Sequence, residues 1–188
     1  MEADDVMLDS VIERAQLGGD GVDCLPVGDR HRLQLWGRLP PGWAGNLTLH
    51  TFSAGLHIDS GDAIRTREGL WAASFLLRSR ERLERLRHDF LNMARRAPRL
   101  LPELPTPVVT IAAELSHDSP GHVYARVRGK DSVGLLADLL RRFAALQLQP
   151  RRFVLRTEGE EVRDWFWLEP SGPIVPSPAD LAVLESDG

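Results

Sequence analysis

The chain has 188 residues, 43% of them hydrophobic and 27% charged, and its formal net charge is -4. This composition predicts one large globular domain or two small ones and excludes a disordered chain. The negative charge does not favour nonspecific nucleic-acid binding, although it leaves room for a local basic patch. Cys24 is the single cysteine, so an intrachain disulfide and a structural cysteine cluster are both excluded.

The first residues are acidic and lack the basic start and apolar core of a signal peptide. No run reaches the ~18 apolar residues that a membrane span needs. We therefore expect a cytoplasmic protein that does not bind membranes. Residues 6–17 have an amphipathic helix pattern that ends at glycines. Residues 22–27 contain Pro26 and are either an edge strand or a loop. We predict that residues 1–27 form an N-terminal helix and linker.

Residues 28–115 are predicted to form the first of two modules. Its expected elements are a strand at 33–36, a helix at 43–54, strands at 56–65 and 70–77, a helix at 80–97 and a strand at 108–115. The helix at 80–97 has the clearest pattern, because apolar residues recur at every third or fourth position. Its excess of arginine indicates a solvated face, or alternatively a surface for an acidic partner.

Residues 121–188 are predicted to form the second module. Its expected elements are a strand from Val123, a polar turn at 129–134, a helix to Leu146, strands at 153–157 and 162–168, and a short helix at 179–185. This module lacks most of its last helix and its fourth strand. Either it is truncated, or residues 22–27 supply a strand to its sheet.

The two modules share one element order. When the chain is shifted by 92 positions, Gly37 falls on Gly129 and Gly42 on Gly134. The same shift places apolar residues on apolar residues, for example Leu47 on Leu139, Leu56 on Leu148, Leu70 on Val162 and Leu76 on Leu168. A match of this length predicts a duplicated domain rather than a solenoid.

The strand-to-helix turn of the second module contains Gly129, Asp131, Gly134, Leu135 and Leu136. With the hairpin at 157–166, this turn resembles an ACT domain, a small regulatory module that binds amino acids. The likeness is greatest to the ACT pair that ends bacterial signal-transducing uridylyltransferases. It implies an α+β fold of two tandem ferredoxin-like modules, with helices on one face of each antiparallel sheet. It also implies a stand-alone regulatory protein that senses a small effector, such as an amino acid.

In the resembled family, this turn holds the effector, usually where two modules meet. Its residues here are Lys130, Asp131, Ser132, Val133, Gly134 and Leu135. The free amides at a helix start can bind a carboxylate, and Asp131 can accept hydrogen bonds from an ammonium group. Gly134 permits close approach of the backbone to a ligand. In the alternative interpretation, Asp131 or Ser132 only caps the helix and Gly134 makes room for packing.

The first module departs from this pattern at the equivalent turn. Leu39 stands where the second module has Asp131, and Pro40 and Pro41 follow it. Prolines remove amide donors, and leucine cannot pair with an ammonium group. We therefore expect the first turn to be structural only.

Trp165 and Trp167 lie on one face of their expected strand, and Phe166 and Leu168 lie on the other. The 92-residue shift matches the tryptophans to Ala73 and Phe75. Two exposed tryptophans would form a large patch unless a partner sheet, the other module or the N-terminal helix covers them. We expect them to form an interface, in a homodimer or with a partner protein. RNA binding is disfavoured by the charge and by the lack of a basic, glycine-containing strand.

We find no nucleophile elbow, phosphate-binding loop or metalloprotease helix motif. His57 with Asp59, and His117 with His122, could each contact a metal, but two ligands do not make a site. We therefore expect no enzyme activity, no cofactor and no metal. The alternative to an effector sensor is a ligand-free module for dimerisation or protein interaction.

Overall fold

The computed structural model describes residues 2–79, 89–96, 108–117, 119–132, 134–173 and 175–186. Val133 and most of the helix predicted at 80–97 lie outside the described residues. The elements are α1 (Glu2–Gln16), β1 (Gly21–Val27), β2 (Arg30–Gly37), α2 (Trp43–Ser53), β3 (Leu56–Arg65), β4 (Trp71–Ser79), α3 (Asp89–Arg95), β5 (Val109–Leu115), β6 (Val123–Lys130), α4 (Leu135–Ala145), β7 (Leu148–Glu158), β8 (Glu161–Pro170) and α5 (Pro178–Ser186).

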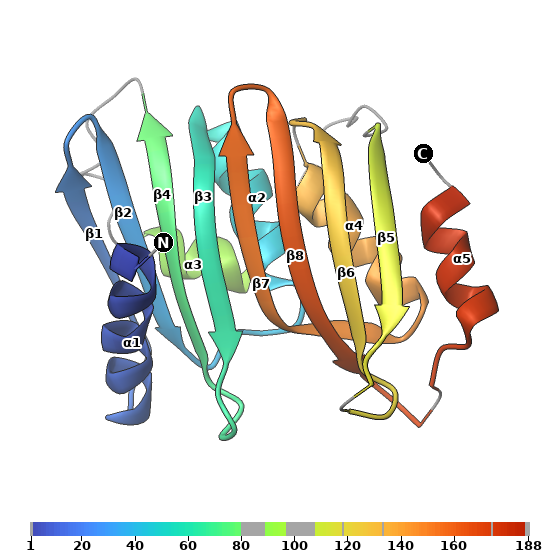
Figure 1. The fold of residues 1–188 in the computed structure, drawn as a ribbon. Coiled ribbons are helices and arrows are strands. Elements are labelled where there is room, and N and C mark those ends of the chain that lie inside the picture. The colour runs from blue at the N-terminus through green and yellow to red at the C-terminus, as the bar shows by residue number, and fades with distance from the viewer. Residues whose placement is uncertain are drawn as a thin grey trace.

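The described strands form one eight-stranded antiparallel sheet in the order β1-β2-β4-β3-β7-β8-β6-β5 (Figure 1). Helices α2, α3 and α4 cover one face, which we call the inner face, and α1 lies on the opposite, outer face. Helix α5 lies beside β5 at the edge of the sheet. The predicted α+β class is confirmed. The two sheets expected from the sequence are joined edge to edge through β3 and β7.

The core lies between the sheet and the inner-face helices. Its largest fully buried side chains include Phe75 on β4, Phe153 on β7 and Phe166 on β8. The ring centroids of Phe75 and Phe153 are 6.3 Å apart, and those of Phe153 and Phe166 are 6.1 Å apart. Full burial of each such side chain contributes about 1.5–3 kcal/mol. Because these rings come from three strands, they join the two halves of the sheet into one core.

Helix α1 covers part of the outer face. Its buried residues Leu8, Val11 and Ala15 pack on Ala72 of β4. The Arg14 guanidinium lies 5.2 Å from the centroid of the Trp36 ring and 2.6 Å from the Asp23 carboxylate. The predicted N-terminal helix therefore packs on strands β2 and β4.

The same order of elements, strand-strand-helix-strand-strand-helix, occurs twice, from β1 to α3 and from β5 to α5. We call these the first half and the second half. Residues 22–27 form an edge strand, so the option that they complete the second sheet is ruled out, and the assignment of residues 109–115 to the first module is wrong. Strand β1 pairs with β2 and adds nothing to the second half, and residues 109–115 pair with β6 of the second half. The reason is the short connection, because the two-residue turn at Gly28 and Asp29 places β1 beside β2. The second half therefore has a fourth strand, which precedes its other three.

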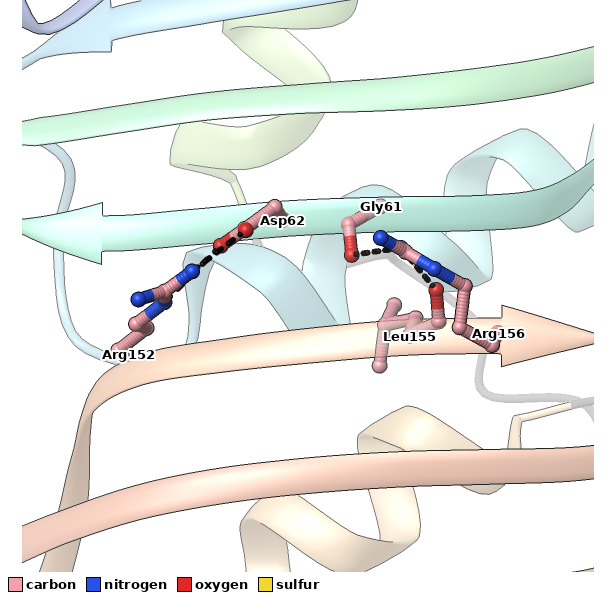
Figure 2. Close-up of polar contacts among 5 residues, drawn as sticks. All are labelled: Gly61, Asp62, Arg152, Leu155 and Arg156. Carbon is pink, nitrogen blue, oxygen red and sulfur yellow. Dashed lines mark hydrogen bonds and ion pairs between the residues drawn. The ribbon is translucent and has the colours of Figure 1, made fainter. Parts of the chain in front are cut away.

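The joint between β3 and β7 has two-fold symmetry. Ser60 pairs with Arg156, Asp62 with Val154 and Ile64 with Arg152. A shift of 92 positions moves Ser60 to Arg152, which is the partner of Ile64, and moves Ile64 to Arg156, which is the partner of Ser60. The same shift moves Asp62 to its own partner, Val154. Figure 2 shows the side chains of Arg152 and Arg156 reaching from β7 to β3. Arg152 Nη2 lies 2.9 Å from Asp62 Oδ2, and Arg156 Nη1 donates to the Gly61 carbonyl at 3.3 Å.

The 92-residue shift fits the helices α2 and α4 and the strands β3 and β7, but it fails by one residue between β4 and β8. Helices α2 and α4 begin after Gly42 and Gly134, whose φ angles are 76° and 77°. The buried positions of β4, however, match those of β8 at a shift of 91, so that Phe75 corresponds to Phe166. The hairpin of the second half is one residue shorter. The match of Ala73 and Phe75 to the tryptophans is therefore wrong, because a slip of one residue reverses the faces of a strand.

Candidate functional site

The predicted turn of the second module, residues 130–135, connects β6 to α4 and is called the second turn. Gly134 is the N-cap residue in the left-handed conformation, and α4 has no side-chain cap. The prediction that Asp131 or Ser132 caps this helix is therefore wrong. A left-handed N-cap favours glycine, because other side chains clash with the backbone there. The first amides of α4 are consequently not occupied by a capping side chain.

A cavity of about 250 Å³ lies beside the second turn. Asp131, Ser132, Gly134 and Leu135 line it, so four of the six predicted residues meet at one site. Lys130 is not part of the lining, and its ammonium lies 3.2 Å from the Glu160 carboxylate. Val133 lies outside the described residues.

The opposite wall of the cavity comes from the first half. Thr48, Thr51 and Phe52 of α2 and His57 of β3 contribute to it. Helices α2 and α4 pack on one another, which brings this wall against the second turn. The cavity therefore lies where the two halves meet.

Two carboxyl groups of the second half line the cavity. Asp164 of β8 is 5% exposed, and its Oδ1 accepts a hydrogen bond from the Arg156 backbone amide at 3.2 Å. Burial is the main cause that raises the pKa of Asp164 to about 7, and the nearby charge of Asp131 adds to it. Burial also raises the pKa of Asp131, which the charge of His57 partly offsets.

Asp59 of β3 lies near Asp131 but differs from the two lining carboxyl groups. Its carboxylate lies 3.3 Å from Arg30 and 3.2 Å from Arg78, so its charge is compensated by two guanidinium groups. Among the described residues that line the cavity, none is Lys or Arg. The site therefore combines two acidic side chains with the uncapped start of a helix.

Asp164 and His57 were not predicted as members of this site. Asp164 has a signal in the sequence, because it occupies an inward position of β8 between Val162 and Phe166, where an apolar residue is expected. The sequence gives no such signal for His57, since it belongs to the other half. Within the residues that the structure describes, no group of three His, Cys, Asp or Glu side chains could hold a metal ion.

The equivalent turn of the first half, residues 38–43, is called the first turn and is filled by side chains. Leu39 is 9% exposed and Trp43 is 2% exposed. The rings of Trp43 and Trp71 meet edge to face, with centroids 5.3 Å apart. Large apolar groups therefore occupy the region where the second half has Asp131 and Asp164.

Trp165 and Trp167 point to the outer face, opposite the fully buried Phe166 and Leu168. Trp165 is half-buried and Trp167 is 38% exposed. The Trp167 ring lies 5.4 Å from that of Tyr124, and the Arg152 guanidinium lies 5.2 Å from its centroid. Helix α1 contacts β2 and β4 of the first half, at the other end of the sheet (Figure 1). The interface role of the two tryptophans stays a prediction.

No family model and no curated protein matches this chain. One similar solved structure is that of aspartate kinase from Synechocystis, with 16% sequence identity and a TM-score of 0.43. The match covers 84% of this chain and 26% of that chain, so this chain spans about a quarter of its length. None of the described helices is long and apolar enough to cross a membrane.

Proposed function

We propose that the protein is a regulatory ACT-type sensor that binds an amino acid in the cavity beside the second turn. The observation that carries this proposal is the cavity itself. It opens at the turn whose residues resemble an ACT effector site, and both halves of the chain line it. Its volume of about 250 Å³ is below the roughly 300–1,000 Å³ of pockets for drug-sized ligands, so it suits a small metabolite.

The two charged groups of an amino acid fit different parts of this site. Its carboxylate can accept hydrogen bonds from the uncapped amides at the start of α4, where the helix dipole also favours negative charge. Its ammonium group can donate to Asp131, and such charge-assisted hydrogen bonds are stronger than neutral ones. Gly134 has no side chain that would block the approach to the helix start.

The proposed sensor acts without catalysis. A ligand shifts a conformational equilibrium only through different affinities for its two states. A bound amino acid would contact α2 and β3 on one side and the second turn on the other, so it favours the arrangement in which these surfaces are close. A partner protein, or a second copy of the chain, then distinguishes the bound state from the free state.

Thermal unfolding in the presence of each amino acid, followed by equilibrium dialysis, tests this proposal. A ligand that binds only the native state raises Tm in proportion to the logarithm of its concentration. We expect a rise with at least one amino acid, and its loss in Asp131→Asn. Glu160→Gln removes a neighbouring exposed carboxylate and should retain binding. If no amino acid binds at concentrations well above millimolar, the proposal fails.

The ligand-free interaction module is then the function to test. Its expected property is a dimer that persists on dilution and shields Trp165 and Trp167 from a soluble quencher.

A further inference from the structure

The proposed amino-acid site contains one more carboxyl group than a neutral amino acid can use. If the start of α4 takes the ligand carboxylate and Asp131 takes its ammonium group, Asp164 has no ligand group to bind. Yet Asp164 lines the same cavity and is 5% exposed. A buried carboxyl group is unfavourable unless hydrogen bonds or an opposite charge compensate it.

The groups around Asp164 compensate its charge only in part, because burial outweighs both the charge of Arg156 and the hydrogen bond from its backbone amide. The Arg156 guanidinium is engaged elsewhere, since its Nη1 donates to the carbonyls of Gly61 and Leu155 at 3.3 and 2.8 Å (Figure 2). Arg30 and Arg78 are paired with Asp59. Asp131 is acidic, and His57 lies on the β3 wall of the cavity.

The remaining lining suits a ligand with a long, partly apolar side chain. Leu135, Leu155 and Val162 supply apolar wall, against which methylene groups can pack. Ser132 Oγ is buried in the same lining and has no hydrogen-bond partner in the described structure. It can accept a hydrogen bond from a ligand that brings several donors, because an unpartnered buried hydroxyl is costly.

We propose that the effector is an amino acid with a positively charged side chain, an ammonium or a guanidinium, which pairs with Asp164 while Asp131 binds the α-ammonium group. This inference rests on the proposed function, because it assigns a ligand class to that same site. It adds a requirement that the proposed function lacks, namely a second positive charge on the ligand.

Proton release follows from this arrangement. The pKa of Asp164 is about 7, so the group is partly protonated near neutral pH when the cavity is free. A cation beside it lowers this pKa and expels the proton. The pKa of Asp131 is also raised, so a ligand cation beside it favours proton release there too. Asp59 is already paired with Arg30 and Arg78 and does not contribute. The His57 side chain faces the cavity as well. Binding should therefore tighten as the pH rises from about 6 to about 8.

Isothermal titration of the full chain with lysine and norleucine separates the two proposals. Norleucine has the four-carbon side chain and the two backbone charges of lysine but lacks the terminal ammonium. We expect lysine or arginine to bind about tenfold or more tightly than norleucine at pH 7.5. Titrations in two buffers of different ionisation enthalpy should show about half a proton released at pH 7 with the basic ligand.

The variants Asp164→Asn and Glu160→Gln complete the experiment. Asp164→Asn keeps the shape of the side chain and should weaken lysine binding about tenfold while changing norleucine binding by less than about twofold. Glu160→Gln removes an exposed charge on the neighbouring hairpin and should change neither. Equal binding of lysine and norleucine, or tighter binding of glutamate, overturns the inference and leaves the proposed function standing. Binding of no amino acid overturns both.

Discussion

The two strand-to-helix turns of this protein have the same backbone conformation, but apolar side chains surround the first turn and acidic side chains surround the second. Gly42 and Gly134 start their helices with φ angles that differ by one degree. Around Gly42, Leu39 and two tryptophans fill the space under the helix. Around Gly134, two carboxyl groups and an uncapped helix start border a cavity.

The glycine turn is a property of the fold, whereas the site is a property of the residues around that turn. A left-handed glycine is needed for the chain to turn from strand into helix in either half. The side chains at equivalent positions, Leu39 and Asp131 on the turn and Ala73 and Asp164 on the strand, decide whether the space is core or cavity. Variants on both sides of this contrast should therefore have different effects.

Trp43→Ala tests whether the first turn is part of the core. Removing a fully buried aromatic side chain should lower the free energy of unfolding by about 3–5 kcal/mol, because the variant loses burial and leaves a void. Urea denaturation followed by far-UV circular dichroism measures this loss. Leu17→Ala, at a residue that is 87% exposed, should change stability by less than about 0.5 kcal/mol. A Trp43 variant with a loss below about 1 kcal/mol would contradict the filled first turn.

Asp164→Asn tests the second turn through the pH dependence of the free energy of unfolding. The pKa of Asp164 is about 7 in the native state and 3.8 in the unfolded chain, so the native state holds the proton more tightly. The free energy of unfolding therefore falls as the pH rises from about 4 to about 7, by up to about 4 kcal/mol. The asparagine variant lacks this loss and should be more stable than the wild type at pH 8, with little difference at pH 4.

Chemical denaturation at pH 4, 6 and 8 measures the difference in the free energy of unfolding between variant and wild type. Glu114→Gln, on an exposed position of β5, serves as the control. If the asparagine variant has the same pH dependence as the wild type, Asp164 does not titrate near pH 7. The carboxyl group would then be compensated by contacts other than those described above.

Gly61→Ala tests a second difference between equivalent positions of the halves. Phe153 occupies the position in β7 that Gly61 occupies in β3. A methyl group on Gly61 would lie 2.2 Å from Phe75 Cδ1, so the ring must move. Overpacking of this kind costs about 1–3 kcal/mol. Ser60→Ala, one residue away, should have little effect, and an alanine at position 61 that left Tm unchanged would show that the core has spare room there.

Arg152→Ala gives the smallest expected effect and concerns the joint. The Arg152 side chain is 36% exposed, and its pairing with Asp62 should contribute at most about 1 kcal/mol because solvent screens the pair. A double-mutant cycle with Asp62→Asn isolates this interaction, which should weaken at high salt. A coupling energy well above this value would mean that solvent screens the pair less than the exposure of Arg152 indicates.

Local periodicity predicted most elements of the fold. The strand at 33–36, the helix at 43–54 and the strands after it were all visible from apolar spacing, and the structure places elements at the same positions. The partners of the edge strands were not visible. Apolar and polar residues alternate only weakly in residues 22–27 and 109–115, and this pattern does not indicate which strand lies beside them. Their assignment follows from connection geometry, which is a property of the folded sheet.

The sequence predicted the turn residues of the site but not the residues of the surrounding walls. Asp131, Ser132, Gly134 and Leu135 belong to one local pattern, so the sequence could group them. Asp164 is about thirty residues away, and the one-residue difference between the two hairpins concealed its equivalence to Ala73. His57 reaches the cavity only because β3 and β7 are neighbours, which no local pattern records.

One consequence follows from the position of the cavity across the boundary between the halves. A molecule bound in the cavity would contact both sides of the joint between β3 and β7 at once. Its arrival would alter the stiffness of this joint even if no atom of the backbone changed its mean position, since ligand binding can act through lost motion alone. Hydrogen exchange at the backbone amides of residues 60–64 and 152–156 would report this change directly. A partner protein would then respond to reduced motion of the sheet, at a surface that does not contact the ligand.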